Sequence, residues 1–120
     1  MNRLLRSILL LFAGSAIVWQ ITGCKHNPAP PTEADAIAVW KNINKSPHYE
    51  DLLSLKKTNG QEQLIDGTEV YTLYYTARIQ NIVKLGNRPP GTVETYNSNY
   101  AFHWTEKGWM GPDNQIYPGH

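Results

Sequence analysis

The stretch TEVYTLYYTARIQNIV, residues 68–83, decides the fold, because it has the clearest alternation of apolar and polar side chains in the chain. Successive side chains of a β-strand point to opposite faces of the sheet. The pattern therefore predicts a long antiparallel strand with one buried face. The apolar set is Tyr71, Leu73, Tyr75, Ala77 and Ile79, and the polar set is Thr72, Tyr74, Thr76, Arg78 and Gln80.

Further strand signals lie on both sides of this stretch. Residues 93–105 alternate in the same way, and residues 53–56 (LSLK) predict a short edge strand. Asn59-Gly60 is a turn or bulge signal, and Asp66-Gly67 is a second one. Trp109-Met110 predicts a final short strand after a tight turn. The apolar side of the second long run carries Tyr96, Ser98, Tyr100, Phe102 and Trp104.

A helix is predicted ahead of the strands. Thr32-Glu33-Ala34-Asp35 matches a capping box, in which the Thr32 side chain satisfies backbone donors of the first turn. Apolar residues then recur at three- and four-residue spacing, which predicts one apolar stripe on a helix. The helix is expected to end at residues 44–46, before Pro47. The stripe consists of Ala36, Ile37, Trp40 and Ile43.

The first 23 residues have the features of an export signal. Arg3 and Arg6 form a positively charged start, and residues 7–19 (SILLLFAGSAIVW) form an apolar run. A helix that crosses a bilayer needs about 20 such residues, so this run is too short to span. Cys24, the single cysteine of the chain, follows directly and cannot form an internal disulfide.

Ile21-Thr22-Gly23-Cys24 resembles the lipobox of bacterial lipoproteins. The resemblance implies that the Cys24 sulfur carries diacylglycerol and that a peptidase cuts between Gly23 and Cys24. Lys25 follows the cysteine, which under the lipoprotein sorting rule implies the outer membrane, facing the periplasm, if the source is Gram-negative. The alternative is an uncleaved signal anchor with an incidental cysteine, and it must explain a cysteine at the cleavage distance behind two small residues.

The chain therefore divides into a signal peptide (1–23), a lipidated cysteine with a proline-rich tether (24–31) and one small domain (32–120). We expect an α+β domain in which one amphipathic helix lies on a curved antiparallel sheet of three to four strands. This order resembles the cystatin-like and nuclear-transport-factor-like group of small α+β folds. The tail WTEKGW, residues 104–109, is similar to the carboxyl end of many small bacterial lipoproteins of that shape whose function is unknown.

The sequence shows no catalytic or metal-binding motif. Residues 24–120 hold nine Lys and Arg against ten Asp and Glu, which argues against nucleic acid as a partner. His103 is a weak catalytic candidate on the polar face of its strand, where it could face Arg78 or Glu94. Tyr74 and Trp109 are candidates for an exposed contact surface, as aromatic rings supply large contact areas.

These features predict a membrane-anchored envelope lipoprotein with a small binding or structural domain. Its expected partners are the membrane, through the lipid on Cys24, and an envelope protein or a cell-wall component. We expect no enzyme activity, no cofactor and no metal. Two alternatives remain open: an inhibitor of an extracytoplasmic hydrolase that presents the loop 84–91, and a small enzyme with a cleft between helix and sheet. The ligand and the oligomeric state are left open.

Overall fold

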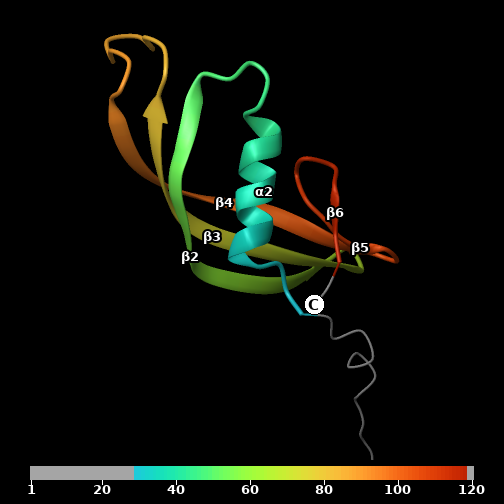
Figure 1. Cartoon of the computed structure of the whole chain (residues 1–120). Coiled ribbons are helices and arrows are strands. Elements are labelled where there is room, and N and C mark those ends of the chain that lie inside the picture. Colours follow the sequence, from blue (N-terminus) through green and yellow to red (C-terminus); the bar gives the residue numbers. More distant parts are fainter. Residues whose placement is uncertain (1–28, 119–120) are drawn as a thin grey trace, which may run out of the picture.

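The computed structural model describes residues 29–118, which form one helix packed against a curled five-strand antiparallel sheet, a half-barrel (Figure 1). The expected α+β class is confirmed, whereas the sheet has five strands in place of the expected three to four. The signal peptide and Cys24 lie outside the described residues. The elements are α2 (Glu33–Ile43), β2 (Glu50–Ile65), β3 (Thr68–Asn81), β4 (Val93–Thr105), β5 (Gly108–Met110) and β6 (Ile116–Tyr117), and the strands follow one another in the sheet in this order.

Helix α2 begins with the predicted capping box. The backbone N–H of Asp35 donates to Thr32 Oγ1 (3.2 Å), and the N–H of Thr32 donates to the Asp35 carboxylate (2.9 Å). The buried face differs from the predicted stripe, because Val39 is fully buried while Ile43 is 47 % exposed. Ile43 lies in the last turn and lines a surface depression together with polar residues such as Asp113 and Gln115.

Strand β2 is much longer than the predicted short edge strand. Its register against β3 shifts between Leu52 and Ser54 and again between Lys57 and Asn59, which are positions of β-bulges. The first bulge turns Leu53 outward, where it is 44 % exposed, so Leu52 and Leu55 face the core instead of Leu53 and Leu55. The second bulge coincides with the predicted turn or bulge signal Asn59-Gly60.

Strands β3 and β4 have the faces that their alternation predicts. All five apolar residues of the opening stretch are buried, and Phe102 of β4 is fully buried beside them. Asp66 and Gly67 form the two-residue turn between β2 and β3, both with positive φ (50° and 81°), as a hairpin turn of this length requires. The predicted core of the sheet is therefore confirmed.

The last part of the expected tether belongs to the domain. Pro31 is fully buried, and Lys57 Nζ donates to its carbonyl oxygen (3.4 Å). Trp109 Nε1 donates to the carbonyl oxygen of Ala29 (3.0 Å). The chain is thus fixed to β5 before the helix begins.

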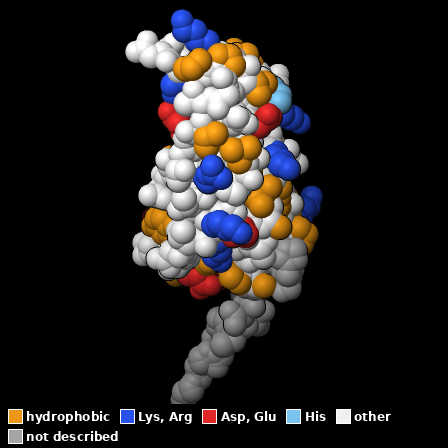
Figure 2. Space-filling model, turned by 60° about the vertical axis from the view of Figure 1, so that its left-hand side comes forward, with side chains coloured by type: hydrophobic (Ala, Val, Ile, Leu, Met, Phe, Trp, Pro, Cys, Tyr) orange, Lys and Arg blue, Asp and Glu red, His pale blue; other side chains and the backbone are white. Residues whose placement is uncertain are grey.

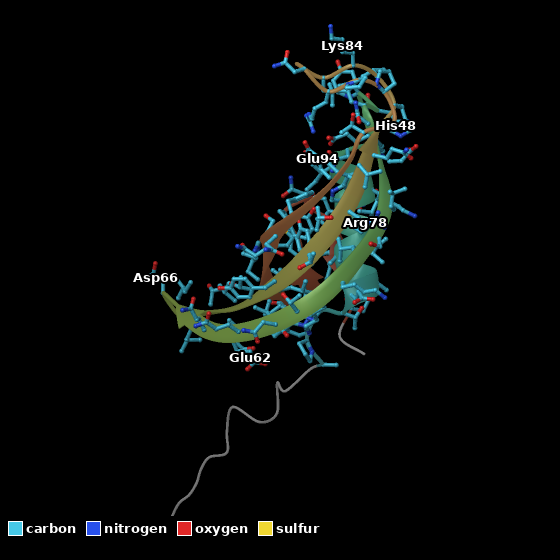
Figure 3. All side chains as sticks on the ribbon, turned by 90° about the vertical axis from the view of Figure 1, so that its left-hand side faces the viewer. His48, Glu62, Asp66, Arg78, Lys84 and Glu94 are labelled. Carbon is cyan, nitrogen blue, oxygen red and sulfur yellow. The ribbon has the colours of Figure 1, made fainter. Side chains whose placement is uncertain are left out.

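The long connection from β3 to β4 is organised by Asn81. This residue is buried, and its Nδ2 donates to the carbonyl oxygens of Val83 (2.8 Å) and Pro89 (2.7 Å). Within the loop, Leu85 and Arg88 exchange two backbone hydrogen bonds (3.0 and 2.9 Å). The loop that carries Lys84 therefore forms a folded projection at the end of the sheet opposite the Asp66 turn (Figure 3).

Candidate binding surface

The two faces of the sheet differ sharply in what covers them. Helix α2 packs on one face, over the buried residues of β2 and β3. The opposite side, which we call the open face, has no covering element among residues 29–118. It carries the alternate side chains of three long, bent strands (Figure 3). The middle of the open face consists of Asn59 and Gln61 from β2, Thr72, Tyr74 and Thr76 from β3, and Asn97 and Asn99 from β4.

Tyr74 lies at the centre of this surface. Its register partners are Asn59 on one side and Asn99 on the other. The hydroxyl reaches the diagonal neighbour Gln61 Oε1 (3.4 Å), so the side chain leans along the strand and leaves part of its ring exposed. The alternation of residues 68–83 predicts Tyr74 on the polar face, and this placement is confirmed. The side chain is half-buried, and its role in a contact surface stays a prediction.

A shallow depression of about 430 Å³ lies beside Tyr74. Thr76 Oγ1 donates to Asn97 Oδ1 (2.6 Å) across its floor, which fixes both side chains. The volume falls in the range of small-ligand sites, about 300–1,000 Å³. The residues that line it are Thr58, Tyr74, Tyr75, Thr76, Asn97, Ser98 and Asn99.

The chemistry of this depression is neutral and polar. Its lining offers hydroxyl and amide groups, which both donate and accept hydrogen bonds, beside an aromatic ring. Two cations border the depression on the same face: Lys56 is the register partner of Thr76, and Arg78 follows Thr76 along β3. Such a surface suits an uncharged ligand rich in hydroxyl and amide groups, which stacks an apolar ring face on the tyrosine.

Trp109 does not lie on this surface, and the expectation that it is exposed is wrong. It is 3 % exposed and packs against the rings of Tyr71 (6.2 Å) and Trp104 (5.2 Å), with its N–H bonded to Ala29. A tryptophan beside a turn resembles a surface residue in sequence. Here the docked segment before the helix covers it.

The histidines do not form a catalytic group with the residues expected beside them. His103 lies between Val70 and Met110, whereas Arg78 and Glu94 lie toward the other end of the sheet. His48 contacts the Asp51 carboxylate (2.8 Å), and both side chains are about half exposed. No group of three or more His, Cys, Asp and Glu side chains that could hold a metal ion occurs in the described part of the chain.

The depression beside His48 and Asp51, about 410 Å³, is lined by residues from the end of α2 and the start of β2, among which charged side chains alternate with Trp40, Asn44 and Leu52. Another, about 300 Å³, lies near the Asp66 turn between Glu62, Glu69 and Leu64. Neither brings a nucleophile next to a base. On the face of the molecule that Figure 2 presents, the apolar side chains form separate small groups rather than one large patch.

The surroundings of Tyr100, Tyr117 and Asp113 shift their pKa values from the ordinary ones. Burial, together with hydrogen bonding to Tyr75, raises the pKa of Tyr100. Burial also raises the pKa of Tyr117, whose hydroxyl donates to Asp113 Oδ2 (2.6 Å). For Asp113, partial burial favours the neutral form. Hydrogen bonds from Asn42 (2.9 Å), Tyr117 and the Gln115 backbone outweigh it and lower the pKa.

Comparison with known proteins adds no relative: no protein-family model matches the chain, and no curated protein and no solved structure matches it either.

Among residues 29–118 there is no helix with the length and apolar content needed to cross a bilayer.

Proposed function

We propose that this protein is a lipid-anchored lipoprotein of the bacterial cell envelope whose domain binds an uncharged, hydroxyl-rich ligand of the cell wall. The observation that carries the binding role is the depression on the open face, whose lining of uncharged polar side chains includes the ring of Tyr74. The lipobox-like sequence that ends at Cys24 supports the anchor. With Lys25 after the cysteine, the outer membrane facing the periplasm is the location we propose for a Gram-negative source.

The anchor would hold the domain close to the lipid. A single acyl chain binds a membrane only reversibly, whereas two or more hold a protein firmly. Because Ala29 is fixed to Trp109, the five residue steps from Cys24 to Ala29 can span at most about 17 Å. The open face would then act within a short distance of the membrane surface.

A glycan fits the open face better than a charged or apolar ligand. Sugar rings have an apolar face that stacks on aromatic side chains, and their hydroxyl and acetamido groups pair with side chains such as Asn97 and Asn99. Cell-wall glycan is the neutral polymer that an anchored envelope domain would meet. We expect neither catalysis nor a cofactor for this role.

Binding can be tested by co-sedimentation of the full chain, in detergent, with insoluble cell-wall sacculi. We expect the protein to sediment with the sacculi, and Tyr74→Ala to lower the affinity measured over a sacculus titration at least about fivefold, in line with the 1–3 kcal/mol that a stacking aromatic contributes. Gln63→Ala, on the same face but outside the depression, is the matched control. Wild-type protein that stays in the supernatant, or equal binding by the Tyr74 variant, would refute the glycan role.

The anchor is tested separately by mass spectrometry of protein extracted from membranes. We expect a chain that begins at Cys24 and carries the mass of acyl chains, and a Cys24→Ala variant that leaves the membrane fraction. A product that starts at Met1 with an unmodified thiol would contradict the lipoprotein assignment.

An inhibitor of an extracytoplasmic hydrolase is the second candidate, and the ordering of loop 84–91 favours it. Asn81 ties the base of the loop, and the paired Leu85 and Arg88 stiffen its tip, as a loop that fits an enzyme cleft would need. Co-purification with a hydrolase that is lost in Arg88→Ala would favour this role. We also propose a cystatin-like relationship, which the order of the helix and the strands supports.

A further inference from the structure

Strand β4 has an open edge along most of its length. β5 pairs only with His103, Trp104 and Thr105, so residues 93–102 have β3 on one side and no strand of the described chain on the other. Open edges present unpaired N–H and C=O groups that can pair with another strand. The structure must therefore either protect this edge or use it.

Antiparallel alternation shows which backbone groups face the open edge. Next to β4, the N–H of Asn81 donates to the Thr92 carbonyl oxygen (3.2 Å), and the Gly91 N–H donates to the Asn81 carbonyl oxygen (2.7 Å). Odd-numbered residues of β3 therefore bond toward β4, and the register continues without a shift to Val70. Their partners on β4 are even-numbered, which leaves the N–H and C=O of residues 95, 97, 99 and 101 directed to the open edge.

The other long edge, on β2, is protected. It has two bulges and carries Lys56 and Lys57 in succession, and the Lys57 N–H donates to the Glu33 carboxylate (2.8 Å). Bulges, lysines and covering side chains are the usual protection against edge pairing. From residue 95 to 101, β4 has no bulge, no proline and no charged side chain. The contrast points to β4 as an edge that is left available.

The sequence of this edge is its own mirror image. Tyr96-Asn97-Ser98-Asn99-Tyr100 reads the same in both directions about Ser98. When such a strand pairs antiparallel with a second copy about a two-fold axis at Ser98, each tyrosine faces a tyrosine and each asparagine faces an asparagine. Uncharged cross-strand pairs of this kind are favourable, whereas like charges would repel.

The same register matches the free backbone groups. Asn97 would stand opposite Asn99 of the second copy, and Thr95 opposite Ala101, so all the edge-directed groups between residues 95 and 101 find partners. Tyr96 and Tyr100, which are partly exposed beside Tyr75, would be covered by each other across the axis. The pairing between the two copies cannot extend to His103, because this residue is already paired with Met110 of β5.

We propose that the protein forms a two-fold dimer in which β4 pairs antiparallel with β4 of a second copy, centred on Ser98. An isologous contact of this kind closes on itself and leaves no further free edge on β4. The two sheets become one, and the two open faces meet along Asn97 and Asn99.

Oxidative crosslinking of the full chain tests this pairing. In Ser98→Cys, the two cysteines would form a non-hydrogen-bonded pair with Cα atoms about 4.5 Å apart, inside the range for a disulfide. We expect a covalent dimer at least about tenfold faster than in Gln63→Cys, an exposed position away from β4. The wild-type chain under the same oxidant reports any contribution from Cys24.

The mass of the non-oxidised protein in detergent provides the second measurement. We expect a dimer for the wild type and a monomer for Ser98→Lys, because the two lysines would face each other across the axis. Gln63→Lys should remain dimeric. A monomeric wild type, or crosslinking of Ser98→Cys no faster than the control, overturns the proposal, as would capture of a strand from a different protein at this edge. Neither result depends on sacculus binding, so the two proposals can fail separately.

Discussion

Gly60→Ala should destabilise the domain even though Gly60 lies in the edge strand β2. The residue pairs with Leu73 on the helix-covered face, and the ring of Tyr71 crosses over it. A Cβ at this position would overlap the hydroxyl oxygen and Cζ of Tyr71 and lie 3.2 Å from Cε1. Tyr71 is 6 % exposed, with Lys57 Nζ 4.9 Å from its ring centroid and Trp109 on another side, so the ring can move only by giving up those contacts.

Overpacking of a core costs about 1–3 kcal/mol, and an aromatic pair contributes about 0.5–1.5 kcal/mol beyond its area. We therefore expect Gly60→Ala to lower the free energy of unfolding by about 2 kcal/mol, or the Tm by about 8–16 °C for a domain of this size. Without the clash, alanine in a strand would be favoured over glycine by roughly 0.5–1 kcal/mol. A loss of stability in Gly60→Ala would therefore show that the Tyr71 ring lies over residue 60, and a gain would show that it does not.

Urea unfolding followed by circular dichroism measures the effect, with Gln63→Ala as an exposed control on the same strand. In a Tyr71→Leu background, Gly60→Ala should cost much less, because the shorter side chain no longer crosses the glycine. A stabilising Gly60→Ala, or an equal cost in both backgrounds, would refute the reasoning.

Three further predictions concern single side chains. Thr32→Ala removes the helix cap and should cost about 1 kcal/mol in urea unfolding. Asn81→Ala removes the side-chain donor that bonds the carbonyl oxygens of Val83 and Pro89; we expect a loss of about 1–3 kcal/mol and faster tryptic cleavage after Lys84. Asp113 has a pKa below its ordinary 3.8, so its charged form stabilises the fold above that pH and the benefit is lost as the pH falls through the lowered pKa. The stability of the wild type over Asp113→Asn should therefore shrink on acidification in urea titrations, whereas an unchanged difference would contradict the role of the contact with Tyr117.

Much of the fold could be predicted because several local signals agree. The alternation of residues 68–81 and 93–105 fixes two long strands, and Asp66-Gly67 fixes the turn before the first of them. The capping box at Thr32 fixes the start of the helix. Each signal depends on neighbours in sequence, so no tertiary information is needed.

The errors occur where tertiary contacts overrule local pattern. The bulges of β2 interrupt its alternation, so a strand of sixteen residues resembles a short one. β6 has two residues and no period of its own; it forms because β5 provides an edge. Trp109 is buried because the segment at Ala29 returns to cover it, and no spacing rule predicts that contact.

The candidate site was predicted only in part. Tyr74 could be placed on the polar face from alternation alone, and the Asp66-Gly67 turn would then place Gln61 beside Thr72. The register of β4 could not be derived in this way, because the loop 82–92 between β3 and β4 does not fix it. Asn97 and Asn99 were therefore missed, although their strand was recognised. The processing at Cys24 remains a prediction.

Solvation alone explains why the open face is polar, but it does not explain why the side chains that line the depression beside Tyr74 are all uncharged. A strand that only needs to be soluble is well served by Lys and Glu, which this chain uses elsewhere. Neutral amide and hydroxyl groups are needed if a glycan binds at Tyr74 or if two β4 edges meet at Asn97 and Asn99. The two requirements can be tested apart. Ser98→Lys reports on pairing alone, through the mass of the protein, because Ser98 also lines the depression and its substitution could affect binding as well. Tyr74→Ala should weaken binding without altering the edge. Asn99→Lys would place a charge on the open face and at the β4 edge, and we expect it to impair both glycan binding and dimer formation.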